Sequence, residues 1–155
     1  MKGNFLALVF FALFAVACSK DESRTDNQIV GKWHLERNII YSGKDGKVLS
    51  SYKADACEQK QSYEFMADGQ CIAKVPMEEE GKCNEYQIAI TNYRYNPSAK
   101  SITFIYQGGT EDEVEDEIKL YKSSSVEIEL EFDEYDPDFD NDGVDDHYIS
   151  VFSKD

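Results

Sequence analysis

The chain has 155 residues, of which 41% are hydrophobic, and 31 Asp and Glu residues against 16 Lys and Arg residues give it a net charge of -15. It is too short for two ordinary domains. A polyphosphate backbone needs clustered Lys and Arg to release its counterions, and this sequence has no such cluster, so we expect no nucleic-acid partner.

The N-terminus has the pattern of an export signal. Met1 and Lys2 precede an unbroken apolar run of thirteen residues from Phe5 to Ala17, which is shorter than the roughly 20 residues needed to cross a bilayer. The run ends in Ala-Val-Ala-Cys at 15–18, which resembles the lipobox of bacterial lipoproteins. That resemblance implies that Cys18 is lipidated and anchors the chain in a membrane; the alternative is an ordinary cleaved signal with a coincidental Cys.

The residues after Cys18 refine the predicted location. Ser-Lys-Asp-Glu at 19–22 is similar to the export signal that some Bacteroidetes lipoproteins carry after the lipidated Cys. The similarity implies display on the outer face of the outer membrane, with anchoring that faces the periplasm as the alternative. We therefore divide the chain into a signal peptide (1–17), a lipidated Cys with a flexible tether (18–28) and one folded domain (29–155).

Hydrophobic residues of the folded domain alternate with polar ones almost throughout, which is the period of β-strands. Trp33, Leu35 and Ile39 form the first such set. The others lie in the ranges Tyr63–Phe65, Cys71–Val75, Tyr86–Ile90, Ile102–Tyr106, Val114–Leu120, Val126–Phe132 and Tyr148–Phe152. The pattern predicts an all-β fold of eight or nine antiparallel strands, arranged as a single up-and-down barrel or a strongly curved meander.

A family resemblance rests on a few of these residues. The Gly31-Lys32-Trp33 opening is similar to the Gly-x-Trp first strand of lipocalin-like proteins, and Tyr63 to Phe65 with Asp68-Gly69 look like the small lipocalin-like lipoproteins of Bacteroidetes. The resemblance implies a lipocalin-like barrel that binds a small apolar or amphipathic molecule in its interior. The candidate wall residues are Tyr63, Tyr86, Tyr106 and Tyr121. We expect Trp33 to close one end of the core.

Three cysteines remain when Cys18 is lipidated. If Ala67-Asp68-Gly69 is a three-residue hairpin loop, Phe65 pairs with Cys71 and Cys57 lies about nine residues away, roughly 30 Å. Such a distance cannot be bridged. We therefore predict a disulfide between Cys57 and Cys83, with Cys71 as a small buried hydrophobic residue.

The acidic residues are concentrated near the C-terminus, where residues 111–146 hold 17 of the 31 Asp and Glu. Within this segment, residues 138–146 match the start of a calcium loop, D-x-D-x-D-G. The candidate ligands are the side chains of Asp138, Asp140, Asp142 and Asp146 and the carbonyl of Val144. The alternative is a solvated hairpin tip rich in turn residues. The glutamates at 127, 129 and 131 are expected to cover the outer face of their strand.

The sequence has no motif that indicates catalysis, and we expect no enzyme. No nucleophile elbow, zinc-ligand spacing or glycine-rich phosphate loop occurs, and the two histidines, His34 and His147, are expected to have structural roles. Two functions remain open. One is a lipid-anchored, monomeric barrel with a small ligand; the other is a surface interaction module with a filled barrel and an acidic loop organised by Ca²⁺.

Overall fold

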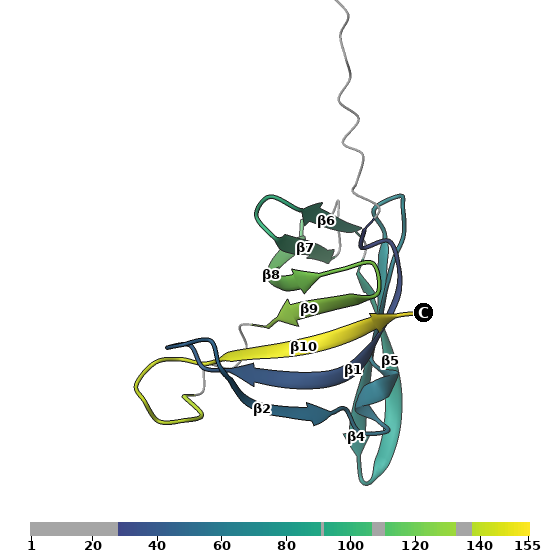
Figure 1. The fold of residues 1–155 in the computed structure, drawn as a ribbon. Coiled ribbons are helices and arrows are strands. Elements are labelled where there is room, and N and C mark those ends of the chain that lie inside the picture. The colour runs from purple at the N-terminus through teal and green to yellow at the C-terminus, as the bar shows by residue number, and fades with distance from the viewer. Residues whose placement is uncertain (1–27, 91, 107–110, 133–137) are drawn as a thin grey trace, which may run out of the picture.

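The computed structural model describes residues 28–90, 92–106, 111–132 and 138–155. The predicted signal peptide, Cys18 and nearly all of the predicted tether lie outside these residues. Within them the chain forms one sheet of ten strands, more than the eight or nine predicted, and a short 3-10 helix η1 (Glu58–Lys60) (Figure 1). The strands are β1 (Gly31–Tyr41), β2 (Val48–Lys53), β3 (Ser62–Phe65), β4 (Cys71–Glu79), β5 (Lys82–Ile90), β6 (Asn92–Asn96), β7 (Ser101–Tyr106), β8 (Val114–Ser123), β9 (Glu127–Glu131) and β10 (His147–Lys154). None of the described helices is long and apolar enough to span a bilayer.

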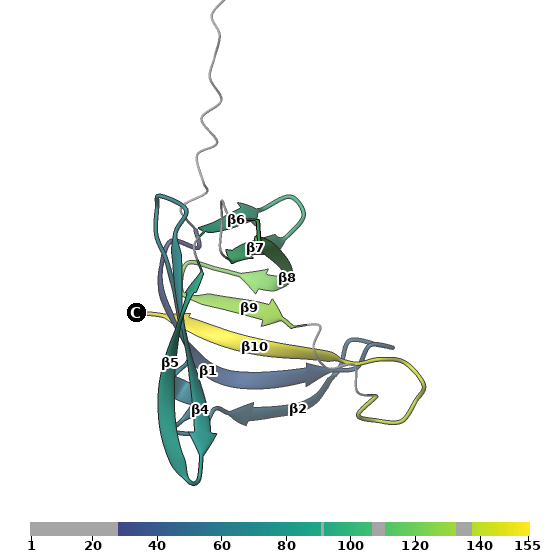
Figure 2. The ribbon, with the colours of Figure 1, turned by 180° about the vertical axis from the view of Figure 1, so that it is seen from behind.

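The sheet is a curved antiparallel meander that does not close. Its order is β5-β4-β3-β1-β10-β9-β8-β7-β6, with β2 as an additional partner of β1. The first and last strands are therefore paired, as in a barrel, while β5 and β6 end the order on opposite sides. The β4–β5 hairpin crosses the end of β1 and β10, and the loop before β10 projects from their other end (Figures 1 and 2). Of the two predicted arrangements, the structure confirms the curved meander.

Strand β1 organises this sheet. It pairs with β10 from Trp33 to Tyr41, and the ladder slips by one residue at Glu36. On its other edge, the part before the slip pairs with β3 and the part after it pairs with β2. This β-bulge reverses the alternation of side chains along β1, because one residue of the strand has no counterpart opposite it.

The bulge gives the sheet two apolar faces. Before it, Trp33 and Leu35 belong to the large core, on what we call the inner face. After it, Ile39 and Tyr41 pack with β10 on the opposite, outer face. The prediction that Ile39 shares a face with Trp33 is therefore wrong, because strict alternation takes no account of a bulge.

The inner core is dominated by aromatic side chains. Trp33 is fully buried, and its indole N–H donates to the Ile29 carbonyl at 2.7 Å, which satisfies the polar end of the ring as expected. Tyr63 stacks on Phe104, with ring centroids 5.5 Å apart, and meets Phe152 edge to face. The ring contacts join β3, β7 and β10 across the curve of the sheet.

The cysteines are placed as predicted. Phe65 pairs with Cys71 across the β3–β4 turn, where Gly69 has a positive φ of 89° that favours glycine. A disulfide joins Cys57 to Cys83, whose Cα atoms are 5.5 Å apart, and attaches the η1 segment to the β4–β5 hairpin. Cys71 is a buried free thiol, and burial raises its pKa to about 12, so the thiol is protonated and unreactive at neutral pH.

The glutamates of β9 lie on the outer face, as the alternation predicts, but two of them are not solvated. Glu129 is 3% exposed and Glu131 is 8% exposed. The apolar residues that the β1 bulge brings to this face, together with Tyr121, form a second cluster beside them. By contrast, residues 78–80 and the charged residues from 111 to 117 are exposed.

Candidate functional site

The four tyrosines proposed as wall residues do not surround one cavity. Tyr63 is buried in the inner core, and Tyr106 packs against the same cluster. Tyr121 packs against the outer-face cluster, and Tyr86 is 43% exposed on β5. Alternation predicts which side chains share one face of a strand, but it does not predict which strands face one another across the fold.

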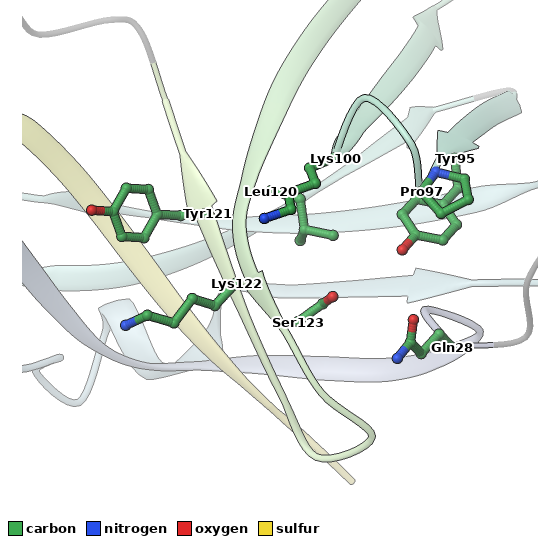
Figure 3. Close-up of a pocket in the computed structure, with 8 residues that line it drawn as sticks. All are labelled: Gln28, Tyr95, Pro97, Lys100, Leu120, Tyr121, Lys122 and Ser123. Carbon is green, nitrogen blue, oxygen red and sulfur yellow. The ribbon is translucent and has the colours of Figure 1, made fainter.

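A cleft lies beside β8 at the rim of the sheet (Figure 3). Its volume is about 430 Å³, and its lining residues are Gln28, Tyr95, Pro97, Lys100, Leu120, Tyr121, Lys122 and Ser123. They come from three places: the turn before β1, the end of β6 with the β6–β7 turn, and the end of β8. Of these, only Tyr121 is among the residues predicted for ligand binding.

A second β-bulge shapes this cleft. The pairing of β8 with β9 slips between Leu120 and Lys122, so Tyr121 has no counterpart on β9. Leu120 belongs to the inner core and Tyr121 to the outer cluster, and the bulge places Lys122 on the outer face as well, opposite Glu129. In Figure 3 the side chains of Tyr121 and Lys122 point away from Tyr95 and Pro97, so they contribute a different side of the rim.

The β6–β7 turn holds the opposite wall in place. The Leu120 N–H donates to the Lys100 carbonyl at 2.8 Å, and Lys100 has a positive φ of 53°. The Asn96 side chain accepts from the backbone N–H groups of Ser98 and Ala99. Asn96-Pro97 is visible in the sequence as a turn, but nothing in the sequence places that turn against β8.

The aspartate loop at 138–146 projects from the sheet beside the β1–β2 turn. Asp146 is 3% exposed, and its carboxylate accepts from the backbone N–H groups of Gly43 and Phe139 at 3.0 and 2.7 Å. Asp138 accepts from the N–H groups of Asp142 and Gly143, each at 2.8 Å. The loop is therefore organised around two carboxylates by the backbone itself.

Three of the predicted ligands converge. One carboxylate oxygen from each of Asp138, Asp140 and Asp146 lies within 4.8 Å of the others. Oxygens at opposite sides of a calcium ion are about 4.8 Å apart, since each lies about 2.4 Å from the ion. The spacing of these three residues is compatible with ligation of one cation.

The other two predicted ligands are placed differently. Asp142 accepts from the Val144 N–H at 2.9 Å, and its other oxygen lies 3.4 Å from the Lys44 ammonium. Asp142 is thus outside the converging group, and Val144 is 39% exposed. The sequence spacing identifies the loop, but it does not reveal that Lys44, from a distant turn, competes for one of its carboxylates.

The close packing of carboxylates and backbone N–H groups in this loop shifts the pKa values of two aspartates. Hydrogen bonds from the backbone, above all from the Gly143 N–H, hold the pKa of Asp138 below its usual value. Partial desolvation, followed by the negative charges of Asp142 and Asp146, raises the pKa of Asp140. The charged form of Asp140 is therefore disfavoured in the loop, and a bound cation would relieve the repulsion that it experiences.

The fold and the cleft define a small all-β protein with a curved antiparallel sheet and an aromatic core. The sequence profile of the lipocalin-like domain matches residues 29–130, and the chain belongs to that family. No curated protein matches the chain in sequence.

Two solved structures are similar to the chain. One is a lipocalin-like protein from Bacteroides uniformis, with 20% identity and a TM-score of 0.43, covering 83% of this chain and 99% of that one. The other is an uncharacterized protein from Bacteroides eggerthii, with 17% identity and a TM-score of 0.45, covering 81% of this chain and 98% of that one.

Proposed function

We propose that this chain is a lipid-anchored binding protein of the cell envelope, which holds a small apolar or amphipathic molecule in the cleft beside β8. Membership of the lipocalin-like family supports a binding role rather than catalysis. The observation that carries the proposal is the cleft itself. Its volume of about 430 Å³ lies in the range of small-molecule sites, roughly 300 to 1,000 Å³, and its lining combines apolar and polar side chains.

The rim suits a ligand better than the inner core does. Phe65, Phe104 and Phe152 are at most 1% exposed, so their surfaces are already covered by protein. Tyr95 is partly buried against the same core and also lines the cleft. A ligand in the cleft would extend the aromatic core outward without displacing any buried residue.

Native mass spectrometry of the purified protein tests for a retained small molecule, and the fluorescent amphiphile 1-anilinonaphthalene-8-sulfonate provides a binding assay. We expect Tyr95→Ala to weaken binding of this probe by about tenfold, equivalent to about 1.4 kcal/mol. The matched control is Tyr86→Ala, which removes an exposed tyrosine from β5 and should leave affinity unchanged. Equal effects of the two substitutions, or none from Tyr95→Ala, would place the site elsewhere.

The proposed anchor is Cys18, and its support comes from the thirteen-residue apolar run and the Ala-Val-Ala-Cys sequence that follows. Several acyl chains on one residue hold a protein stably on a membrane, whereas a single chain does so only marginally. Together with Ser-Lys-Asp-Glu at 19–22, this supports display on the outer face of the outer membrane.

In a Gram-negative host fed labelled palmitate, the full-length protein should take up label and sediment with membranes, because its anchor is covalent. Cys18→Ser should abolish both, whereas Cys71→Ser should affect neither. Protease added to intact cells should digest the wild-type protein if it is displayed outward. Label on the Cys18→Ser protein would rule out this anchor.

A second proposed role is calcium binding by the aspartate loop, which would stabilise a surface for interaction with a partner. The specific support is the convergence of Asp138, Asp140 and Asp146 within 4.8 Å. The same loop is tied to the β1–β2 turn through Asp146 and Gly43. A cation there would therefore brace two connections at the end of the sheet.

Calcium at 10 mM should stabilise the protein by about 1.4 to 2.7 kcal/mol, if its Kd lies in the weak extracellular range of about 10⁻⁴ to 10⁻³ M. Thermal unfolding with calcium or with chelator measures this. Asp140→Asn should abolish the effect, and Asp116→Asn, an exposed aspartate on β8, should preserve it. An equal shift from magnesium, or no heat of calcium binding, would contradict the proposal.

A further inference from the structure

The outer face carries a group of side chains gathered around a lysine ammonium, and two of them, Tyr121 and Lys122, also border the cleft. We call it the outer-face box and define it as Tyr41 of β1, Tyr121 and Lys122 of β8, and Glu129 of β9. The rings of Tyr41 and Tyr121 stack, with centroids 5.1 Å apart and an angle of 26° between their planes. Both bulges are needed to build this group, because the bulge in β1 brings Tyr41 to the outer face and the bulge in β8 brings Lys122 there beside Tyr121.

A cation already occupies the box. The Lys122 ammonium lies 5.3 Å from the centroid of Tyr41 and 5.7 Å from that of Tyr121. It also donates to the Tyr41 hydroxyl at 3.2 Å and to Glu129 Oε1 at 3.3 Å. Aromatic rings that surround a cation are an arrangement that proteins use to recognise ammonium ligands, and the carboxylate of Glu129 adds an acceptor of opposite charge.

The occupant and its carboxylate differ in exposure. The side chain of Glu129 is 4% exposed, whereas that of Lys122 is 60% exposed. The acid is therefore a fixed part of the sheet, while the lysine reaches into the box from the solvent side. The lysine itself loses little when it moves into water, because its stem and ammonium are readily hydrated, so the cost of exchange is small when another cation takes its place beside Glu129.

The box also has acceptor capacity that Lys122 does not use. Among the residues that the structure describes, Glu129 Oε2 is buried and has no hydrogen-bond partner. A buried acceptor without a partner costs about 1 to 3 kcal/mol, so such atoms are uncommon in folded proteins. The neighbouring Glu131 differs, because it is paired with His147 at 2.5 Å and with Lys119 at 3.7 Å.

We propose that the outer-face box is a binding site for a primary alkylammonium group, which enters when Lys122 swings out. The three N–H donors of the ligand meet the Tyr41 hydroxyl and the Glu129 carboxylate, and its first methylene groups lie against the two rings. The box shares Tyr121 and Lys122 with the border of the cleft, but their side chains point away from Tyr95 and Pro97, so its ligand is distinct from that of the cleft (Figure 3). If the box binds no alkylammonium group, the proposed function of the cleft is unaffected.

Lys122 acts as a tethered competitor in this arrangement. A group held on a short linker has an effective concentration in the millimolar range or above, so a free amine binds the wild-type protein weakly. Removal of Lys122 leaves Glu129 buried without a counterion, which destabilises the fold. The same removal vacates the box, so a free amine should bind more tightly and restore the lost stability.

Thermal unfolding of Lys122→Ala with n-butylammonium chloride, compared with equal sodium chloride, tests the proposal. We expect a lowered Tm that the amine raises by several degrees, and an apparent Kd at least tenfold below the wild-type value. Tetramethylammonium, which has no N–H donor, should act more weakly. Lys119→Ala is the matched control, because Lys119 is 62% exposed and pairs with Glu131. Its Tm should respond to the amine no more than that of the wild type.

Two further variants keep the test decisive. Lys122→Ala combined with Glu129→Gln should lose the response to the amine, since the carboxylate is gone. If Lys122→Ala does not fold, butylammonium titration of the wild-type protein should shift the NMR signals of the Tyr41 and Tyr121 rings, and Glu129→Gln should abolish those shifts. Rescue that sodium chloride reproduces, rescue that survives Glu129→Gln, or the absence of any response to the amine would overturn the proposal.

Discussion

The bulge at Glu36 is the constraint on which the rest of this structure depends. Strand β1 pairs with β10 on one edge and with both β3 and β2 on the other, and the partner changes where the bulge lies. Two backbone hydrogen bonds fix this point: Leu35 donates to the Gln61 carbonyl, and Ala54 donates to the Glu36 carbonyl. One extra residue thus lets a single strand supply apolar side chains to both faces of the sheet.

The two faces differ in chemistry. The inner face is an aromatic core without charged residues, and it leaves room for a ligand at the rim, where the β6–β7 turn meets β8. The outer face combines a small apolar cluster with the buried acids Glu129 and Glu131. The acidic residues behind the net charge of -15 are therefore not all solvated, because Glu129 and Glu131 are buried in the sheet beside tyrosine and lysine side chains.

Much of the fold follows from local patterns in the sequence. Alternation identifies most of the strands, the Asp68-Gly69 turn sets the pairing of Phe65 with Cys71, and that pairing leads to the Cys57–Cys83 disulfide. These inferences succeed because each depends on neighbours in one hairpin. Strand β2, with every residue exposed, has no inward-facing apolar set and was not predicted.

The predictions that failed concern features that are set by contacts between residues far apart in the sequence. Strict alternation puts Ile39 on the same face as Trp33, because no residue in the sequence signals the bulge between them. It places Glu129 and Glu131 on the outer face correctly, but their surroundings depend on Tyr41 and Lys122, which two separate bulges bring there. The cleft has the same origin, because its walls are far apart in the sequence. The aspartate loop is visible from its spacing, whereas the ion pair of Asp142 with Lys44 is not.

The most direct test of this account compares two versions of residue 36 by urea unfolding. Glu36→Ala retains the bulge and removes an exposed side chain that bonds to Ser153, so it should cost about 1 kcal/mol or less. Deletion of Glu36 removes the bulge and sends either Trp33 and Leu35 or Ile39 and Tyr41 to the wrong face, which should cost more than about 3 kcal/mol or prevent folding. A deletion variant as stable as Glu36→Ala would contradict the central role of the bulge.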